Sequence, residues 1–264
     1  MRCLLTIMSC PVLAIVPCVA AEDGAAANRQ IKLPGMVINL TKKFVDLEAT
    51  VCVTDGLLEL VACTNGSKEH ESIVSVTARA MHIHTGLLAI GATNGRPSTR
   101  QKVNSDEERW VQIPAHGDRI RIMFVVNDEG GKPVERPVRD FVLASRERID
   151  EVDGKVLVAP ESKTSSNQPL KVFPETFVFA GSMYRKTEQP PHPYSADLSG
   201  NVISIATFGD EVLCLPTQQS HNNRELYWRA NPNTLPKRGT KITLRLRTVP
   251  KQSEKTNPTK ESSK

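Results

Sequence analysis

The sequence predicts a mainly β protein, built as a sandwich-like or open-barrel arrangement of antiparallel sheets with one short packed α-helix. Three observations support this class. Strand-like segments recur at intervals of roughly ten to twenty residues, turn sequences such as Asp55-Gly56 and 128–131 separate them, and only the stretch at about 82–91 has a convincing helical pattern. Repeated short strands without helices between them favour a sandwich or barrel over parallel βαβ units.

The expected strands are rich in aliphatic and β-branched residues. Segment 119–125 starts with a clean alternation of polar and apolar residues, which indicates a half-exposed strand. Asp55-Gly56 is a strong two-residue hairpin signal, so segments 44–53 and 57–63 are expected to pair with each other. The remaining expected strands are 35–40, 72–76, 110–113, 138–143, 177–180, 202–207 and 240–246.

The expected helix covers about 82–91 and closes at Gly91, because glycine is a common residue at helix C-termini. Its two leucines, Leu87 and Leu88, are expected to pack on a sheet. A further consequence concerns His82 and His84. Two residues at this spacing diverge by about 200° around a helix, so only one of them is expected to point toward His70.

Residues 1–21 have the pattern of a signal peptide. Arg2 precedes an apolar run, and the run ends in the small residues Val19-Ala20-Ala21. We therefore expect an exported protein of the periplasm or cell envelope. No second long apolar run follows, so no transmembrane segment is expected after cleavage.

The rest of the chain is expected to form one β-rich domain over 33–249 and a disordered basic tail over 250–264. From Lys237 onward, nine Lys or Arg residues stand against two Glu residues, so the net charge of +5 is concentrated near the C-terminus. Aromatic residues make up 5% of the sequence, which is little material for stacking bases. These features argue against a nucleic-acid partner.

Three cysteines remain after the signal peptide, namely Cys52, Cys63 and Cys214. An odd number allows at most one internal disulfide and leaves a free thiol. In the expected hairpin, Cys52 and Cys63 lie about 13 Å apart, beyond the reach of about 7 Å for a disulfide. Either of them could pair with Cys214, or all three could be buried thiols.

Chemistry-bearing residues cluster just before the expected strand at 72–76 and at the start of the helix. His70 and His84 are candidate ligands of a divalent transition metal such as zinc, with Glu71, Cys63 or Glu69 as a third ligand. Their spacing matches no established zinc signature. The alternative is a structural hydrogen-bond network in which His84 satisfies backbone groups near the helix start.

The same residues allow a hydrolase interpretation. His70 or His84 would act as the base, Glu71 would orient it, and Ser72 would be the nucleophile. No Gly-x-Ser-x-Gly elbow accompanies them. Asp197, in an Ala-Asp-Leu-Ser-Gly turn, could join this site from the other end of the chain or serve only as a turn residue.

Two motifs carry a resemblance to a known family. The stretch Cys63-Thr-Asn-Gly-Ser-Lys-Glu-His-Glu-Ser72, followed by Ile83-His-x-x-Leu-Leu-x-x-Gly91, is similar to the YdjY-type domain of bacterial exported proteins. Similar pieces follow in order at 179–182, 194–203 and 238–244, so the resemblance spans about 33–249. Family members often carry Asp at the position of His82, which speaks against His82 as a site residue.

The family has no established activity. The resemblance therefore implies an exported binding or accessory module for an unknown envelope ligand or protein, with a metal site around His70 and His84 as one form of it. The alternative is an envelope hydrolase that uses His70, Glu71, Ser72 and His84.

Overall fold

The computed structural model describes residues 28–103, 109–145, 149–152, 155–158, 172–217 and 226–250. The expected signal peptide at 1–21 and residues 251–264 of the expected tail lie outside these ranges. The described chain is mainly β, as the sequence predicts. Within the described ranges, no helix is long and apolar enough to cross a membrane.

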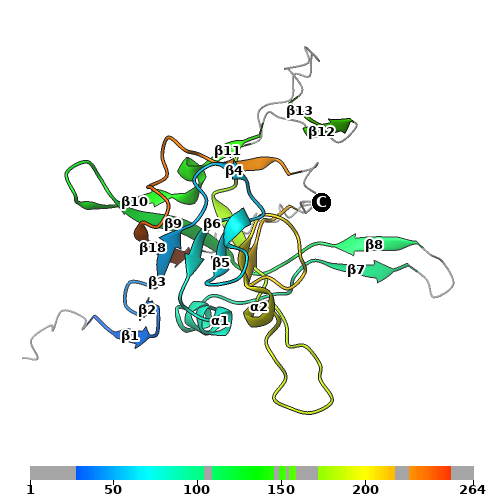
Figure 1. Cartoon of the computed structure of the whole chain (residues 1–264). Coiled ribbons are helices and arrows are strands. Elements are labelled where there is room, and N and C mark those ends of the chain that lie inside the picture. The colour runs from blue at the N-terminus through cyan, green and yellow to red at the C-terminus, as the bar shows by residue number, and fades with distance from the viewer. Residues whose placement is uncertain are drawn as a thin grey trace, which may run out of the picture.

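Eight strands form a closed barrel, in the order β3-β18-β9-β14-β16-β15-β5-β6, and β6 pairs back to β3 (Figure 1). Two neighbouring pairs are parallel, β5 with β6 and β15 with β16, and the other six are antiparallel. The barrel strands are β3 (Phe44–Val51), β5 (Leu60–Thr64), β6 (Ser72–Val76), β9 (Arg119–Asn127), β14 (Thr176–Phe179), β15 (Asn201–Ser204), β16 (Leu213–Cys214) and β18 (Lys241–Thr248). The sequence predicts a sandwich or an open barrel of antiparallel sheets. In the structure, the pairing of β6 with β3 closes the sheet into a barrel.

Other strands extend the barrel or form small sheets outside it. The barrel sheet continues into β1 (Gln30–Leu33) and β2 (Met36–Asn39) beside β3, and β10 (Pro133–Pro137) pairs with β9. The small sheets are β11 (Val142–Ala144) with β17 (Trp228–Ala230) and β4 (Gly56–Leu57), then β12 (Ile149–Val152) with β13 (Lys155–Val158), and β7 (Thr99–Lys102) with β8 (Trp110–Ile113). Two short 3₁₀ helices are η1 (Glu69–Glu71) and η2 (Val138–Phe141).

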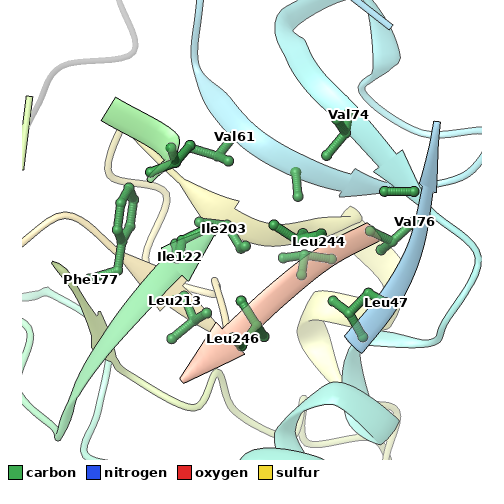
Figure 2. Packing of buried hydrophobic residues seen from close by; sticks show 14 of the residues in the cluster. Leu47, Val61, Val74, Val76, Ile122, Phe177, Ile203, Leu213, Leu244 and Leu246 are labelled. Atoms are coloured by element: carbon green, nitrogen blue, oxygen red, sulfur yellow. The ribbon is translucent and has the colours of Figure 1, made fainter. Parts of the chain in front are cut away.

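Aliphatic and aromatic side chains fill the barrel. In β9 and β18 buried residues alternate with partly exposed ones, so one face of each strand points into the barrel and the other faces outward. Figure 2 shows the inward side chains of Ile122, Leu244 and Leu246 packed against those of neighbouring strands. An eight-stranded barrel is just wide enough for such side chains. The interior is therefore packed core, which leaves the ends and the outer surface of the barrel for a functional site.

Helix α1 (Ala80–Ala89) begins two residues before the expected start and packs at one end of the barrel (Figure 1). Gly86 makes this close approach possible, since a Cβ added there would lie 2.8 Å from the Met36 side chain. Leu87 is fully buried, whereas Leu88 is 44% exposed. The expectation that both leucines pack on a sheet is therefore right for Leu87 and wrong for Leu88.

A second helix, α2 (Ser195–Ser199), was not expected from the sequence. It contacts α1 and ends at Gly200, whose φ of 79° is in the left-handed region that glycine adopts without strain. The 194–203 motif thus forms α2 followed by β15. The contact between α2 and α1 brings this motif next to the motif at 83–91.

The hairpin expected around Asp55-Gly56 is wrong. β4 pairs with β17 instead, and an ion pair of 2.7 Å between Asp55 Oδ1 and Arg229 Nη2 holds the turn against β17. β5 pairs with β6, which lies between β5 and β3. Tertiary pairing therefore overrides the local turn signal.

This topology also bears on the cysteines. Cys52 follows β3 and Cys63 lies on β5, so β6 separates them by about 9.6 Å at a strand spacing of about 4.8 Å. That distance is too long for a disulfide. Cys52, Cys63 and Cys214 are all free and buried.

Candidate functional site

Residues from distant parts of the chain meet where α1 begins. Arg79 is the N-cap residue of α1, and its Nη2 atom lies 2.8 Å from Asp197 Oδ2, on α2. The other oxygen of the same carboxylate, Oδ1, accepts a hydrogen bond of 3.2 Å from the Met81 backbone N–H. Asp197 therefore satisfies one of the free N–H groups in the first turn of α1 and places a negative charge at the positive end of the helix. The sequence left two roles open for Asp197, and the structure shows it joined to the start of α1.

A pocket of about 370 Å³ opens at this junction, and we call it the α1–α2 pocket. One part of its wall is polar and another part is apolar. The side chain of Arg79 is 65% exposed, whereas that of Asp197 is only 12% exposed. Asp197 thus holds the arginine from within, and the guanidinium faces solvent. The pocket is lined by Thr64, Asn65, Val76, Thr77, Ala78, Arg79, Pro193, Tyr194, Asp197 and Leu198.

A hydrogen-bond network fixes one wall of this pocket. His84 Nδ1 lies 2.9 Å from the Gly181 carbonyl oxygen and 2.8 Å from the Tyr194 hydroxyl. The Tyr194 hydroxyl donates to the same carbonyl at 2.8 Å. Phe179 packs against the imidazole with ring centroids 5.0 Å apart. These contacts hold the Tyr194 ring, which lines the pocket, in one orientation.

The electrostatics of His84 follow from its half-buried position. Burial lowers the pKa of His84, and the hydrogen bond to Gly181 opposes this only in part, so the ring is neutral at pH 7. A carbonyl can only accept, which places the proton on Nδ1 and leaves the lone pair on Nε2. This matches the expectation that His84 satisfies backbone groups near the start of the helix.

His70 and Glu71 lie in a different setting, within η1. The His70 side chain is 78% exposed, and its Nε2 atom is 3.6 Å from Glu71 Oε2. Glu71 Oε1 is 3.7 Å from Lys68 Nζ. Contacts of this kind between solvated side chains contribute about 1 kcal/mol or less.

Cys63 and Ser72 are fully buried. The Ser72 hydroxyl donates to the Lys68 carbonyl oxygen at 2.7 Å. Burial is the main cause that raises the pKa of the Cys63 thiol, which stays protonated at neutral pH. These two groups therefore stabilise the β5–β6 connection from inside.

Comparison with known protein families assigns the chain to one of them. A sequence model of the YdjY domain matches residues 36–247. The chain belongs to the YdjY-domain family. Comparison with curated proteins and with solved structures gave no match. The matched range contains the whole barrel core and every residue that lines the α1–α2 pocket.

In this YdjY domain, four of the candidate metal ligands, His70, His84, Glu71 and Cys63, have different surroundings. His84 contacts Gly181 and Tyr194, His70 contacts Glu71 at the surface, and Cys63 is buried. A neutral His84 that donates from Nδ1 has the tautomer typical of a metal ligand. Among the described residues, however, no three His, Cys, Asp or Glu side chains form a metal-binding group. A zinc site at His70 and His84 stays a prediction.

The sequence alone did not point to several residues of the α1–α2 pocket, above all Arg79 and Tyr194. Arg79 lies three residues before the expected helix start at about 82, and its pairing with Asp197 joins residues 118 positions apart. Tyr194 stands in the 194–203 motif, so the resemblance had marked its neighbourhood without giving it a role. His82 has a buried Nδ1 atom without a hydrogen-bond partner among the described residues, and it does not line the pocket.

Proposed function

We propose that this YdjY-domain protein is an exported, non-enzymatic binding module of the periplasm or cell envelope, and that its ligand binds in the α1–α2 pocket. One observation carries the proposal. The pocket forms where the 63–72 motif, the start of α1 and the 194–203 motif converge, and it presents an exposed arginine that Asp197 orients.

The lining of the pocket indicates the chemistry of the ligand. A guanidinium has five N–H donors, and the hydrogen bond to Asp197 uses one of them. The solvent-facing donors suit a carboxylate or phosphate group. Leu198 is 56% exposed and supplies an apolar surface next to this charge. We therefore expect a ligand with an anionic group beside an apolar part.

The geometry favours binding over hydrolysis. A serine nucleophile needs a general base within hydrogen-bond reach. Ser72 is fully buried, and its hydroxyl is bonded to the Lys68 carbonyl. No histidine of the described residues forms a hydrogen bond with Ser72. This environment of Ser72 supports a binding module over the hydrolase alternative.

Site-specific photo-crosslinking in cells tests the proposal. A photoactivatable residue at Leu198, on the pocket rim, is expected to capture an envelope component. The same residue at Val134, which is 39% exposed on β10, is the matched control and should capture none. Arg79→Gln should reduce the Leu198 adduct by about tenfold, the effect of losing about 1.4 kcal/mol of binding.

Arg139→Gln is the control for the arginine change, because Arg139 is also exposed and paired with a carboxylate, that of Glu175. It should leave the Leu198 adduct unchanged. Equal adducts at Leu198 and Val134, or equal effects of the two arginine variants, would contradict the assignment of the pocket.

Export is tested on protein recovered from the cell-envelope fraction. We expect the protein recovered there to begin at Glu22 or a neighbouring residue, because Val19-Ala20-Ala21 fits a signal-peptidase cleavage site. Mass spectrometry of the intact protein measures this directly. Recovery of a chain that still begins at Met1 would speak against a cleaved signal peptide.

A further inference from the structure

The β7–β8 hairpin extends away from the barrel (Figure 1). Its two strands pair only with each other among the described residues. At its base, an isolated bridge joins Arg96 to His116, and the Ser98 hydroxyl donates to the Ile113 carbonyl oxygen at 3.0 Å. A two-stranded hairpin is only marginally stable by itself. These contacts therefore stabilise the base of the hairpin, whereas β7 and β8 pair with no other strand of the described chain.

One face of the hairpin carries an aromatic ring between cations. The register pairs Arg100 with Gln112 and Lys102 with Trp110, so these four side chains share a face. Trp110 is 55% exposed, and Lys102 Nζ lies 5.5 Å from the centroid of its ring. Tryptophan and arginine are among the residue types enriched in protein-binding hot spots.

A hollow of about 520 Å³ lies along this face and is lined by Arg100, Trp110, Val111 and Gln112. Trp110, Val111 and Gln112 are consecutive, and consecutive side chains of a strand point to opposite faces. The hollow therefore touches β8 residues of both faces, together with Arg100 of β7. β8 also has an outer edge. That edge faces away from β7, and no strand of the described chain pairs with it. Its backbone groups are available to an added strand.

We propose that the outer edge of β8 binds an extended, acidic segment of a partner protein by β-strand addition. The backbone of the segment would hydrogen bond to β8. Its carboxylates on the face of Trp110 and Gln112 would be within reach of the long side chains of Arg100 and Lys102, one strand further away on β7. These two cations are two residues apart on β7, at a spacing of about 6.6 Å. Alternate residues of an added strand have the same spacing, so a segment with an acidic residue at every second position matches them.

Charge argues for an acidic partner over the other occupants. Neither Arg100 nor Lys102 forms an ion pair within the described part of the chain. The acidic residues of the intervening sequence, at 106–108, lie outside it. The C-terminal segment 251–264 carries four Lys against two Glu, so it is basic and does not fit. A second copy of this chain that paired through the same edge would present β8 itself, Trp110–Ile113, which carries no acidic residue for Arg100 and Lys102.

Tryptophan fluorescence of the mature protein tests this proposal, because the chain has only two tryptophans and Trp228 is 4% exposed. Quenching by acrylamide therefore reports on Trp110. An acetylated Glu-Val-Glu-Val-Glu peptide is expected to protect Trp110 from acrylamide in a saturable manner. A Lys-Val-Lys-Val-Lys peptide should bind at least about tenfold more weakly, a difference of about 1.4 kcal/mol or more.

Variants locate the effect on the hairpin. Arg100→Glu with Lys102→Glu should reverse the preference between the two peptides. Lys132→Glu with Lys241→Glu makes the same change in net charge at exposed positions elsewhere, and should preserve the preference. Arg79→Gln should also preserve it, which separates this proposal from the α1–α2 pocket.

Three results would overturn the proposal. They are no protection of Trp110 by millimolar acidic peptide, equal protection by both peptides, and an equal loss in the two double variants. Binding to phosphatidylglycerol vesicles without binding to the acidic peptide would assign the hairpin to a membrane surface instead. Protection of Trp110 that grows with protein concentration alone would assign it to self-association.

Discussion

Replacing Leu87 with Asp is expected to prevent the domain from folding, whereas replacing Leu88 with Asp leaves it folded. Leu87 is fully buried in the core at the end of the barrel. An unpaired carboxylate there costs several kcal/mol, which is comparable to the whole stability of a typical domain, about 5–15 kcal/mol. Leu88 is 44% exposed, so an aspartate there meets solvent. Its main cost is a negative charge in the last turn of α1, about 0.3–1 kcal/mol.

Alanine variants make the comparison quantitative if the buried aspartate gives no folded protein. Leu87→Ala should lower the free energy of unfolding by about 2–5 kcal/mol, and Leu88→Ala should change it by about 0.5 kcal/mol or less. Urea denaturation followed by circular dichroism measures both. Equal losses at the two positions would show that α1 packs on the barrel with a different face.

The contrast between these two leucines shows where sequence reasoning reached its limit. Adjacent residues on a helix are 100° apart, so only one of Leu87 and Leu88 can face the core of a narrow interface. The stretch lacks a clear apolar period that would tell which one. Gly86 settles the matter in the structure, because α1 approaches β2 and β3 at this small residue.

The fold class was predictable because it depends on local patterns. Alternation in 119–125 and in 240–246 corresponds to β9 and β18, whose buried faces line the barrel. Closure of the barrel was not predictable from such patterns. It depends on parallel pairing of β5 with β6 and on the return of β6 to β3, and the Asp55-Gly56 turn signal points to a different pairing.

The candidate site was only partly predictable for the same reason. Sequence proximity grouped His70 with His84, yet the structure gives them separate partners. The contact between Arg79 and Asp197 joins positions far apart in the chain, and no local pattern predicts such a contact. The resemblance had marked both regions, 63–91 and 194–203, without their relation in space.

Glu211→Gln is expected to stabilise the protein at pH 8 and to make its stability less dependent on pH. Glu211 is fully buried beside β16. Its Oε2 atom accepts hydrogen bonds from the Gly209 and Asp210 backbone N–H groups, at 2.7 and 3.0 Å. Its Oε1 atom is buried without a hydrogen-bond partner among the described residues. Burial is the main cause that raises the pKa of Glu211, and the nearby Asp210 carboxylate also raises it.

The direction of the pH effect follows from this raised pKa. Between the ordinary value of about 4.5 and the raised value, the folded state holds a proton that the unfolded state has lost. Stability therefore falls as pH rises through this window, by at most about 1.4 kcal/mol per pH unit for one proton. Glutamine keeps an oxygen for the two backbone N–H groups and carries no charge, so this loss is removed.

Denaturant unfolding at pH 5 and pH 8 measures the expected result. At pH 8 the Glu211→Gln variant should be more stable than the unsubstituted protein by about 1–3 kcal/mol, the usual cost of an unsatisfied buried polar group. Glu48→Gln, an exposed carboxylate on β3, is the matched control and should show no such gain. If Glu211→Gln is instead less stable by the same amount at both pH values, the carboxylate is ionised in the folded state and its charge is stabilised. In that case the backbone N–H groups of Gly209 and Asp210 stabilise the Glu211 carboxylate in its charged form. Protonation of Glu211 would then not change the stability of the protein between pH 5 and pH 8.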